Sequence, residues 1–455
     1  MNLNPYEDAK AIFLAGVKRV DPALLLDRSL TLEGETLEVR SAGTSHVYDL
    51  KAFRHIVVAG MGKASAVLAS AIERLLGSRI DSGFVVTKAI AGSACSRIRL
   101  AEGGHPVPDS RSVAAGTAVL ELAEQVRLWE AAGERCLAII LVSGGGSALL
   151  SSPVAGISLA EKAAVTRLLL GSGATIQEMN AVRKHLSAVK GGRLAEAFAP
   201  AEILSLVLSD VVGDDLDSIA SGPSVPDAST WKSARRVLAD RAIWEEIPEA
   251  VRRVFEEGTA GKRPDTPKAD SPVFRATRTV IVGSNMLALE GAEEEAGKRG
   301  YASLVLTSGL TGEAREAAKL FPAMAADIGR YGRPLGRPAC VLAGGETTVT
   351  LRGGGLGGRN QELALAVLAG LRRSVSGQGD MVFLSAGTDG NDGPTDAAGA
   401  FASIELAERA EVLGLDPGAY LAANDSYHFF EKTGGLLKTG PTGTNVCDLQ
   451  ILVLP

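Results

Sequence analysis

Short apolar runs recur along this chain, and each run ends in glycines and small polar residues. Continuous apolar runs suit strands that are buried on both faces, as in a mostly parallel sheet between two helix layers. Segments of helical periodicity separate the runs, and this alternation is typical of doubly wound α/β folds. We therefore expect an α/β protein with mostly parallel sheets. The runs lie at 55–60, 83–87, 137–146, 202–210, 278–285, 301–309, 340–347 and 381–390.

The intervening segments predict helices at 63–76, 112–132, 158–170, 176–198, 286–298, 311–331, 360–371 and 404–411. A charged helical stretch and a linker rich in proline, lysine and aspartate interrupt the alternation at 241–269. Such compositions often mark a domain boundary. We expect two doubly wound α/β domains, an N-terminal Rossmann-like domain at 1–240 and a C-terminal domain at 270–455.

The charge and the cysteines exclude several classes of protein. The 47 Lys and Arg against 53 Asp and Glu give a formal net charge of −6 and a pI near 5.6. Neither nucleic acid nor a membrane surface is therefore expected as a partner. The four cysteines form no C-x-x-C pair, which argues against a disulfide framework or a zinc ribbon and favours a cytoplasmic protein. No apolar run approaches the ~18 residues of a membrane span.

Glycine is the compositional outlier, with 53 of 455 residues against an average of about 7%. The glycines cluster directly after the apolar runs. In open α/β sheets, ligands bind outside the carboxyl ends of the strands, where glycines let the backbone approach and helix N-termini offer N–H groups to anions. Any single turn could simply close the fold, but six together indicate an enzyme site for a phosphorylated or carboxylated ligand. The six lie at 60–63, 143–147, 209–215, 283–285, 344–347 and 387–390.

The first of these turns carries a lysine, Lys63, beside Gly60 and Gly62. A cation at the start of a helix is unfavourable unless an anion joins it. Lys63 is therefore expected to meet a phosphate as a point charge, with a solvated surface lysine as the alternative.

The second turn is the strongest candidate for an anion cradle. Gly144, Gly145 and Gly146 lie between two serines, Ser143 and Ser147. Such a stretch can direct several backbone N–H groups at phosphate oxygens. A flexible turn without a ligand is the alternative.

Carboxylates follow two of the runs. Asp210 and Asp389 each lie at an expected strand end, and carboxylates beside a phosphate are typical of Mg²⁺ sites. Asp392 and Asp396 are expected mainly as helix caps and turn residues. Arg359 emerges from a glycine-rich loop and could fork two N–H groups onto a carboxylate or a phosphate.

Two other functions remain open at the level of these motifs. Gly60-x-Gly62-x-x-Ser65 with Asp81 further on partly matches a dinucleotide fingerprint, so an NAD(P)H-dependent reductase is one alternative. A non-catalytic sensor of sugar acids or nucleotides is another. The P-loop and the protein-kinase signatures are absent from the sequence.

Seven longer blocks carry a resemblance to a known family. They are GMGKAS, EGGHPVPD, LVSGGGSALL, NAVRKHLSAVKGGRLA, LVLSDVVGDDLDSIASGPSVPD, LAGGETTVTLRGGGLGGRNQELALA and SAGTDGNDGPTDAAGA. In this order they resemble class II glycerate 2-kinases, which carry a C-terminal MOFRL domain and of which some members are labelled hydroxypyruvate reductase. The resemblance extends from about residue 6 to 453, and Ser224 is a mild departure where Thr is expected.

The resemblance implies a site in a cleft between two α/β domains, the second of the MOFRL type. It implies ATP- and Mg²⁺-dependent phosphorylation of D-glycerate at its 2-hydroxyl. Lys63 and Arg359 match family positions proposed to act in catalysis or substrate binding, and Asp210 is expected to join them. Glu346 and Asn445 match further polar positions and are assigned to ATP, as is the 143–147 turn, while Asp210 and Asp389 are assigned to the metal. We expect a homodimer, although the sequence does not fix the oligomeric state.

Overall fold

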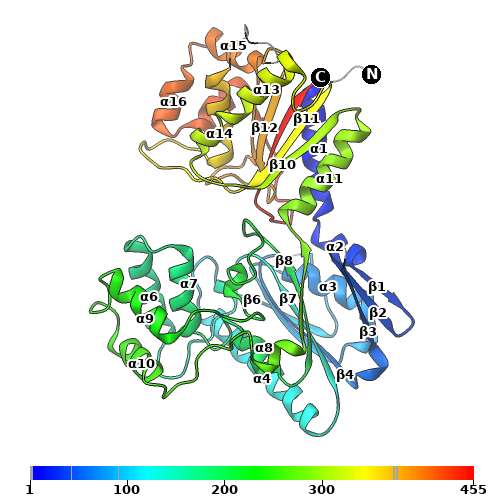
Figure 1. Cartoon of the computed structure of the whole chain (residues 1–455), viewed down its shortest axis with the longest axis vertical. Helices are drawn as coiled ribbons and strands as arrows, with labels where there is room; N and C mark the ends of the chain where they lie inside the picture. The colour runs from blue at the N-terminus through cyan, green and yellow to red at the C-terminus, as the bar shows by residue number, and fades with distance from the viewer. Residues whose placement is uncertain (1–3, 42–43, 91, 372–374, 376–377) are drawn as a thin grey trace. The chain divides into compact units, whose positions relative to one another are not determined.

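The computed structural model describes residues 4–41, 44–90, 92–371, 375 and 378–455, and it divides into two compact units (Figure 1). The N-terminal unit comprises residues 22–209 and 214–282. The C-terminal unit comprises residues up to 21, 210–213 and 283–455. The expected division into 1–240 and 270–455 therefore differs at the start of the chain, because the first helix packs with the C-terminal half.

A six-stranded sheet forms the centre of the N-terminal unit. Its strands in spatial order are β6 (Ile98–Glu102), β5 (Ser82–Thr87), β4 (His55–Met61), β7 (Cys136–Val142), β8 (Glu202–Leu208) and β9 (Thr277–Gly283). The pairs from β6 through β8 are parallel. Numbered along the chain, this order reads 3-2-1-4-5-6, so the connections reverse direction between β4 and β7. Ligands of doubly wound sheets bind outside the carboxyl ends at this reversal.

Helices and a small antiparallel sheet complete the N-terminal unit. Those outside the helical cluster described next are α2 (Pro22–Ser29), α3 (Ser65–Leu76), α4 (Ser110–Ala131), α5 (Gly146–Leu149) and α8 (Arg193–Phe198). The small sheet consists of β1 (Leu30–Glu33), β2 (Thr36–Ser41) and β3 (Thr44–Asp49). The central strands β4 and β7 are buried along almost their whole length, as their continuous apolar runs predict.

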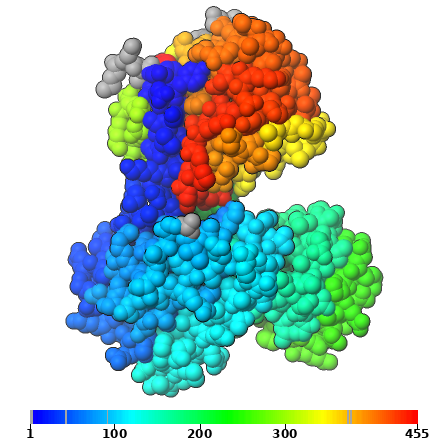
Figure 2. Space-filling view, turned by 180° about the vertical axis from the view of Figure 1, so that it is seen from behind, coloured from blue at the N-terminus to red at the C-terminus, as the bar shows by residue number. Residues whose placement is uncertain are grey.

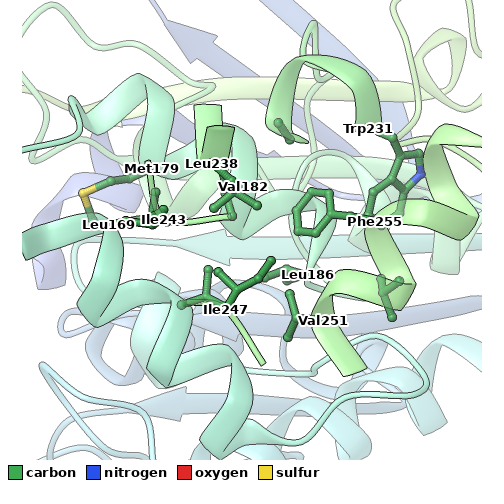
Figure 3. Close-up of a cluster of buried hydrophobic side chains, with 13 residues drawn as sticks. Leu169, Met179, Val182, Leu186, Trp231, Leu238, Ile243, Ile247, Val251 and Phe255 are labelled. Atoms are coloured by element: carbon green, nitrogen blue, oxygen red, sulfur yellow. The ribbon is translucent and has the colours of Figure 1, made fainter. Parts of the chain in front are cut away.

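Four helices of this unit share one apolar core. They are α6 (Leu159–Gly171), α7 (Ile176–His185), α9 (Trp231–Asp240) and α10 (Glu249–Thr259). Figure 3 shows Trp231 and Phe255 close together in this cluster, with ring centroids 5.5 Å apart. The charged helix expected within 241–269 is present as α10, but it belongs to the N-terminal unit and packs in a buried core, since Val251, Val254 and Phe255 lie on one helix face.

Gly258 tests how tightly α10 packs. A methyl group on Gly258 would lie 2.2 Å from the Trp231 ring, whereas one on Gly171 in α6 would meet no atom. We expect Gly258→Ala to lower the free energy of unfolding by about 1–2 kcal/mol, because overpacking outweighs the better helix propensity of alanine. Gly171→Ala is the matched control and should be neutral or stabilising in the same urea titration. Equal midpoints for the two variants would contradict this packing.

Two expected helices are interrupted. The segment 176–198 forms α7 and α8 with a bend between them, because Gly191 and Gly192 adopt φ values of +57° and +80°, which glycine accepts at little cost. The bend places Lys190 outside any helix. The segment 311–331 likewise forms α12 (Ala314–Ala317) and α13 (Leu320–Tyr331).

The C-terminal unit contains a second six-stranded sheet. Its strands in spatial order are β10 (Ala302–Leu310), β11 (Ala339–Gly345), β15 (Asp448–Leu454), β12 (Val382–Gly387), β13 (Gly399–Ala402) and β14 (Leu436–Leu437). Only β10 and β11 pair in parallel among the described residues, because β15 inserts antiparallel between β11 and β12. The second sheet is therefore mixed rather than mostly parallel, although β10, β11 and β12 share one direction.

Helices from both ends of the chain cover this sheet. Figure 2 shows the N-terminal segment packed beside the C-terminal one, and α1 (Pro5–Arg19) contacts both α11 (Asn285–Lys298) and β15. Asp8 of α1 anchors this contact with an ion pair to Arg299 at 2.6 Å and a hydrogen bond from Tyr301 at 2.8 Å. The remaining helices are α14 (Arg359–Gly370), α15 (Ile404–Val412), α16 (Pro417–Ala423) and α17 (Ser426–Thr433).

The predicted α/β class is confirmed, since all eight apolar runs form strands of the two large sheets. Among the described residues, none of the helices combines the length and the apolar character needed to span a bilayer.

Candidate active site

Two loops meet at the reversal point of the first sheet. The backbone N–H of Lys63, after β4, donates to the carbonyl of Gly144, after β7, over 2.8 Å. The N–H of Ser143 donates back to the carbonyl of Met61 over 3.0 Å. The turns at 60–63 and 143–147, which the sequence predicts separately, therefore form one structural element.

Glycines allow this close approach. Gly62 has φ +133°, and a Cβ there would lie 2.1 Å from the hydroxyl of Ser143. Gly145 has φ +78°, and a Cβ there would lie 2.8 Å from the ring of His105 and 3.3 Å from Cε of Lys63. The Lys63 side chain and the His105 ring thus both lie over the backbone of Gly145.

Ser143 supports the loops rather than facing solvent. It is 1% exposed, and its hydroxyl accepts the N–H of Ala64 over 3.1 Å and lies 3.2 Å from the hydroxyl of Ser65. Its part in an anion cradle would be to hold the loop, not to touch the anion.

Lys63 is exposed and forms no ion pair with a carboxylate of the described residues. Burial, together with the charges of Lys63 and Lys88, lowers the pKa of His105. The imidazole is consequently neutral at pH 7, and the edge of the sheet here is cationic through its lysines.

Ser147 joins this edge to residues that the sequence prediction missed. Its hydroxyl accepts from Nη2 of Arg183 at 2.7 Å and from Nζ of Lys190 at 2.8 Å. Lys190 also donates to the carbonyl of Ser147 at 2.6 Å, and the hydroxyl of Ser221 lies 3.0 Å away. The turn after β7 therefore contacts two basic side chains, Arg183 and Lys190, in addition to Lys63.

Lys162 of α6 belongs to the same group of charges. It is 6% exposed, and its Nζ has no hydrogen-bond partner among the described residues. Burial and the charge of Arg183 lower the pKa of Lys162 to about 7. Burial, Lys162 and Arg183 also hold the pKa of Lys190 far below its ordinary value.

Asp81, the acidic residue of the alternative dinucleotide interpretation, lies at the opposite edge of the sheet. It precedes β5, and its carboxylate accepts the N–H of Ile56, at the start of β4, over 2.8 Å and lies 3.3 Å from His55. Ile56 and Gly60 are about 13 Å apart along β4, so Asp81 lies at the wrong end of the strand to contact a ribose bound at Gly60.

In the C-terminal unit, carboxylates gather where three strands meet. Asp448 opens β15 and pairs in register with Gly345 at the end of β11 and with Gly387 at the end of β12. Glu346 follows the end of β11 directly, and Asp389 is the second residue after the end of β12. The antiparallel insertion of β15 thus adds a buried acid to the two that the sequence prediction identified.

Arg359, the first residue of α14, binds two of these acids. Its Nε and Nη2 grip the carboxylate of Asp448 at 2.6 and 2.9 Å, and its Nη1 lies 2.8 Å from Glu346. Asp448 is fully buried, whereas the Arg359 and Glu346 side chains are 34% and 44% exposed. Asp448 therefore fixes the guanidinium from the buried side, and Glu346 pairs with its more exposed edge.

The acids outnumber the arginine and repel one another. Burial raises the pKa of Glu346, Arg359 opposes this shift, and the charges of Asp448, Asp210 and Asp389 add to it. Asp210 lies in this group because its carbonyl accepts a hydrogen bond from the thiol of Cys447 over 3.2 Å. Such an excess of negative charge favours a cation rather than a bare anion.

The other predicted acids and Asn445 have local partners. Asp392 is buried and accepts the N–H groups of Asn360 and Gln361 at 3.1 and 2.8 Å, so it caps α14 as expected. Asp396 is an exposed partner of Lys438. Asn445 is half-buried, and its side chain accepts the N–H of Cys447 over 3.1 Å, which places it beside Asp448.

A pocket of about 470 Å³ opens beside Arg359. Glu346, Arg359, Gly357, Gly358 and Asn424 contribute to its lining. Gly358 is required because a Cβ there would lie 2.3 Å from the carboxylate of Asp392. Within the described part of the chain, no group of three or more His, Cys, Asp or Glu side chains is arranged to hold a metal ion by itself.

Comparison with known proteins identifies the family. Residues 8–256 match a family model described as a domain of unknown function, DUF4147, and residues 339–448 match the MOFRL family. The D-glycerate 2-kinase of Thermotoga maritima is 42% identical over 397 residues, which are 87% of this chain and 90% of that protein. The chain belongs to the glycerate kinase family. The resemblance inferred from the sequence blocks is thereby confirmed.

A solved structure of a family member matches this chain over nearly its whole length. The crystal structure of a glycerate kinase from Thermotoga maritima superimposes with a TM-score of 0.84 at 38% identity and covers 99% of both chains. One relative carries a different name, since a protein of Agrobacterium vitis, 40% identical over 88% of this chain and 87% of its own length, is called a putative hydroxypyruvate reductase.

Proposed function

We propose that this member of the glycerate kinase family transfers the γ-phosphoryl group of ATP to the 2-hydroxyl of D-glycerate, giving 2-phosphoglycerate and ADP. The identity of 42% to a named D-glycerate 2-kinase over most of both chains carries the proposal. The chemistry of the two sheet edges supports it, because phosphoryl transfer needs alignment and charge neutralisation more than covalent catalysis.

The cationic edge of the N-terminal unit is the proposed phosphate site. The turn at 143–147 receives ATP phosphates along its backbone, and Lys63, which lies over Gly145, supplies a mobile positive charge. Lys63 is free of carboxylate partners among the described residues, so no ion pair has to break before it binds the transferred group.

The acidic edge of the C-terminal unit is proposed to hold the other reacting groups. Arg359 meets the carboxylate of glycerate or the γ-phosphate through the edge that Glu346 now occupies. The bond to the 2-hydroxyl oxygen forms as the bond from the γ-phosphorus to the leaving oxygen of ADP breaks. Asp210 or Asp389 accepts the proton of the 2-hydroxyl. Glu346 and Asn445 line the same edge and are assigned to the nucleotide.

Mg²⁺ fits the donors of this edge. Asp210 and Asp389 offer the carboxylate oxygens that Mg²⁺ prefers, and an ion that keeps waters and binds phosphates needs only one or two protein ligands. When bound, the ion supplies charge neutralisation across the phosphates.

The product distinguishes this reaction from its alternatives. We expect the protein to consume ATP only when D-glycerate is present, and enolase alone to convert the product, because a 3-phosphate would first need a mutase. A parallel assay with hydroxypyruvate and NADH should show no loss of nicotinamide absorbance, as expected from the position of Asp81. NADH oxidation without ATP turnover would establish the reductase instead, and a product that requires the mutase would move the attack to the 3-hydroxyl.

A further inference from the structure

Three cationic side chains of the N-terminal unit converge without a counter-charge. Arg183 of α7 and Lys190 of the following bend both donate to the single hydroxyl of Ser147, so their nitrogens are close neighbours. Lys162 of α6 is near enough to act on Lys190 electrostatically. None of the three forms an ion pair with a carboxylate of the described residues.

Lys184 is a buried lysine of the same unit whose charge is compensated by carboxylates, and it serves as a comparison. It is 1% exposed, and its ammonium lies 2.5 Å from Asp217 and 3.4 Å from Asp227. Lys162 and Lys190 are buried to a similar degree, at 6% and 2% exposure, yet they have no such partners. Burial of a cation without compensation is costly, and it lowers the pKa of both lysines. A negative charge supplied by a ligand would stabilise their protonated forms.

We propose that Lys162, Arg183 and Lys190, arranged around Ser147, form a subsite that binds one oxyanion group of a substrate. This inference rests on the proposed function, because Ser147 ends the turn assigned to the phosphates of ATP. It deepens that function by naming side chains, in addition to backbone N–H groups, that recognise the charge. The oxyanion is the carboxylate of glycerate or a phosphate group, which share this chemistry.

Ser147 would position the basic side chains of the subsite. Its hydroxyl holds Arg183 and Lys190 by accepting from both, and Ser221, which donates to Asn180 over 3.2 Å, lies against it. An arriving oxyanion offers charged acceptors to Arg183 and Lys190, which here donate to the uncharged hydroxyl and carbonyl oxygens of Ser147.

The subsite predicts a coupling between binding and protonation. Arg183 from α7 disfavours the protonated form of Lys162. Lys162 and Arg183 together disfavour the protonated form of Lys190 in the bend. An oxyanion beside Lys162 favours the protonated form of Lys162 and raises its pKa from about 7. Binding at pH 8 should take up protons, and affinity should fall as the pH rises above about 7.

Lys162→Met tests the subsite because it removes the charge and keeps most of the side-chain volume. Its matched control is Lys232→Met, which changes an exposed lysine of α9. Calorimetry with D-glycerate, inorganic phosphate or a non-hydrolysable ATP analogue with Mg²⁺ measures affinity, and thermal unfolding without ligand measures stability. We expect Lys162→Met to unfold at a temperature no lower than the wild type and to bind at least one probe at least about tenfold more weakly.

The three probes separate the two sources of the oxyanion. A loss for D-glycerate alone assigns the subsite to the carboxylate, and a loss for phosphate and the ATP analogue assigns it to a phosphate. Wild-type affinity of Lys162→Met for all three probes, or weaker folding with unchanged affinity, would overturn the proposal.

A measurement on the wild type covers the case in which the variant does not fold. Titration at pH 8 in two buffers of different ionisation enthalpy reports proton uptake, and uptake near zero for every probe also overturns the subsite. Failure of the proposed function would look different, since the wild type would then turn over no ATP with D-glycerate while proton-coupled binding of an oxyanion persisted.

Discussion

Replacement of Lys63 by alanine is expected to lower kcat at least about 100-fold, the usual loss when a group that stabilises transition-state charge is removed. Lys63 is exposed over the 143–147 turn and has no carboxylate partner among the described residues. Its charge is therefore available for the phosphates. Because a transferring phosphoryl group gains its strongest contacts in the transition state, kcat should fall more than KM rises.

Stability provides the check on this interpretation. An exposed side chain without an ion pair contributes little to folding, so Lys63→Ala should unfold within about 0.5 kcal/mol of the wild type. Lys51→Ala changes another exposed lysine of the same unit and should leave both steady-state constants unchanged. Near-normal turnover of Lys63→Ala would remove Lys63 from the mechanism.

The positions of the strands could be predicted from the sequence better than the order in which the strands pair in each sheet. Continuous apolar runs identified eight strands, because a strand buried on both faces needs apolar residues at every position. The strand Asp448–Leu454 is buried along its whole length although it contains Asp448 and Gln450. It was not predicted, and its insertion between β11 and β12 makes the second sheet mixed. Pairing order is decided by contacts between distant segments, which a local pattern does not contain.

The candidate site residues in the turns after the strands could be predicted from the sequence. Glycines beside a charged residue directly after a buried apolar run are uncommon, so these positions stood out. Lys63, Arg359, Glu346 and Asp389 all lie at the edges where the pattern predicted them, and their roles remain predictions. The residues that were missed lie on helices, where periodicity treats a charge as solvent-facing. Lys162 in LAEKAAVTRLLLG has this pattern, and only tertiary packing shows that it is buried.

Lys190 could have been found from the sequence. The helix expected at 176–198 contains Gly191 and Gly192 directly after it, and adjacent glycines commonly end a helix. A lysine at such a break cannot continue the solvent face of the helix. The pair of glycines after Lys190 therefore predicts a bend with a lysine at its start. In the structure this lysine donates a hydrogen bond to Ser147.

Asp448 provides the second large effect, through its hold on Arg359. Asp448→Asn keeps the shape of the side chain and removes its charge, so the guanidinium loses the two-point grip of 2.6 and 2.9 Å. We expect kcat/KM to fall at least about 100-fold, because a small displacement of a clamping group is enough for such a loss. An uncompensated buried charge costs ~3–5 kcal/mol, and since Arg359 is partly exposed we expect about 2 kcal/mol of lost stability.

Two comparisons show whether Asp448 acts through Arg359. Asp380→Asn makes the same change in an exposed pair with Arg337 and should alter stability by less than about 1 kcal/mol with no change in kinetics. If Asp448 only positions Arg359, the double variant Asp448→Asn with Arg359→Met should be no slower than Arg359→Met alone, since a lost interaction cannot be lost twice. Additive losses would mean that Asp448 contributes to the reaction independently, and the orienting role derived from its burial and its two hydrogen bonds would be wrong.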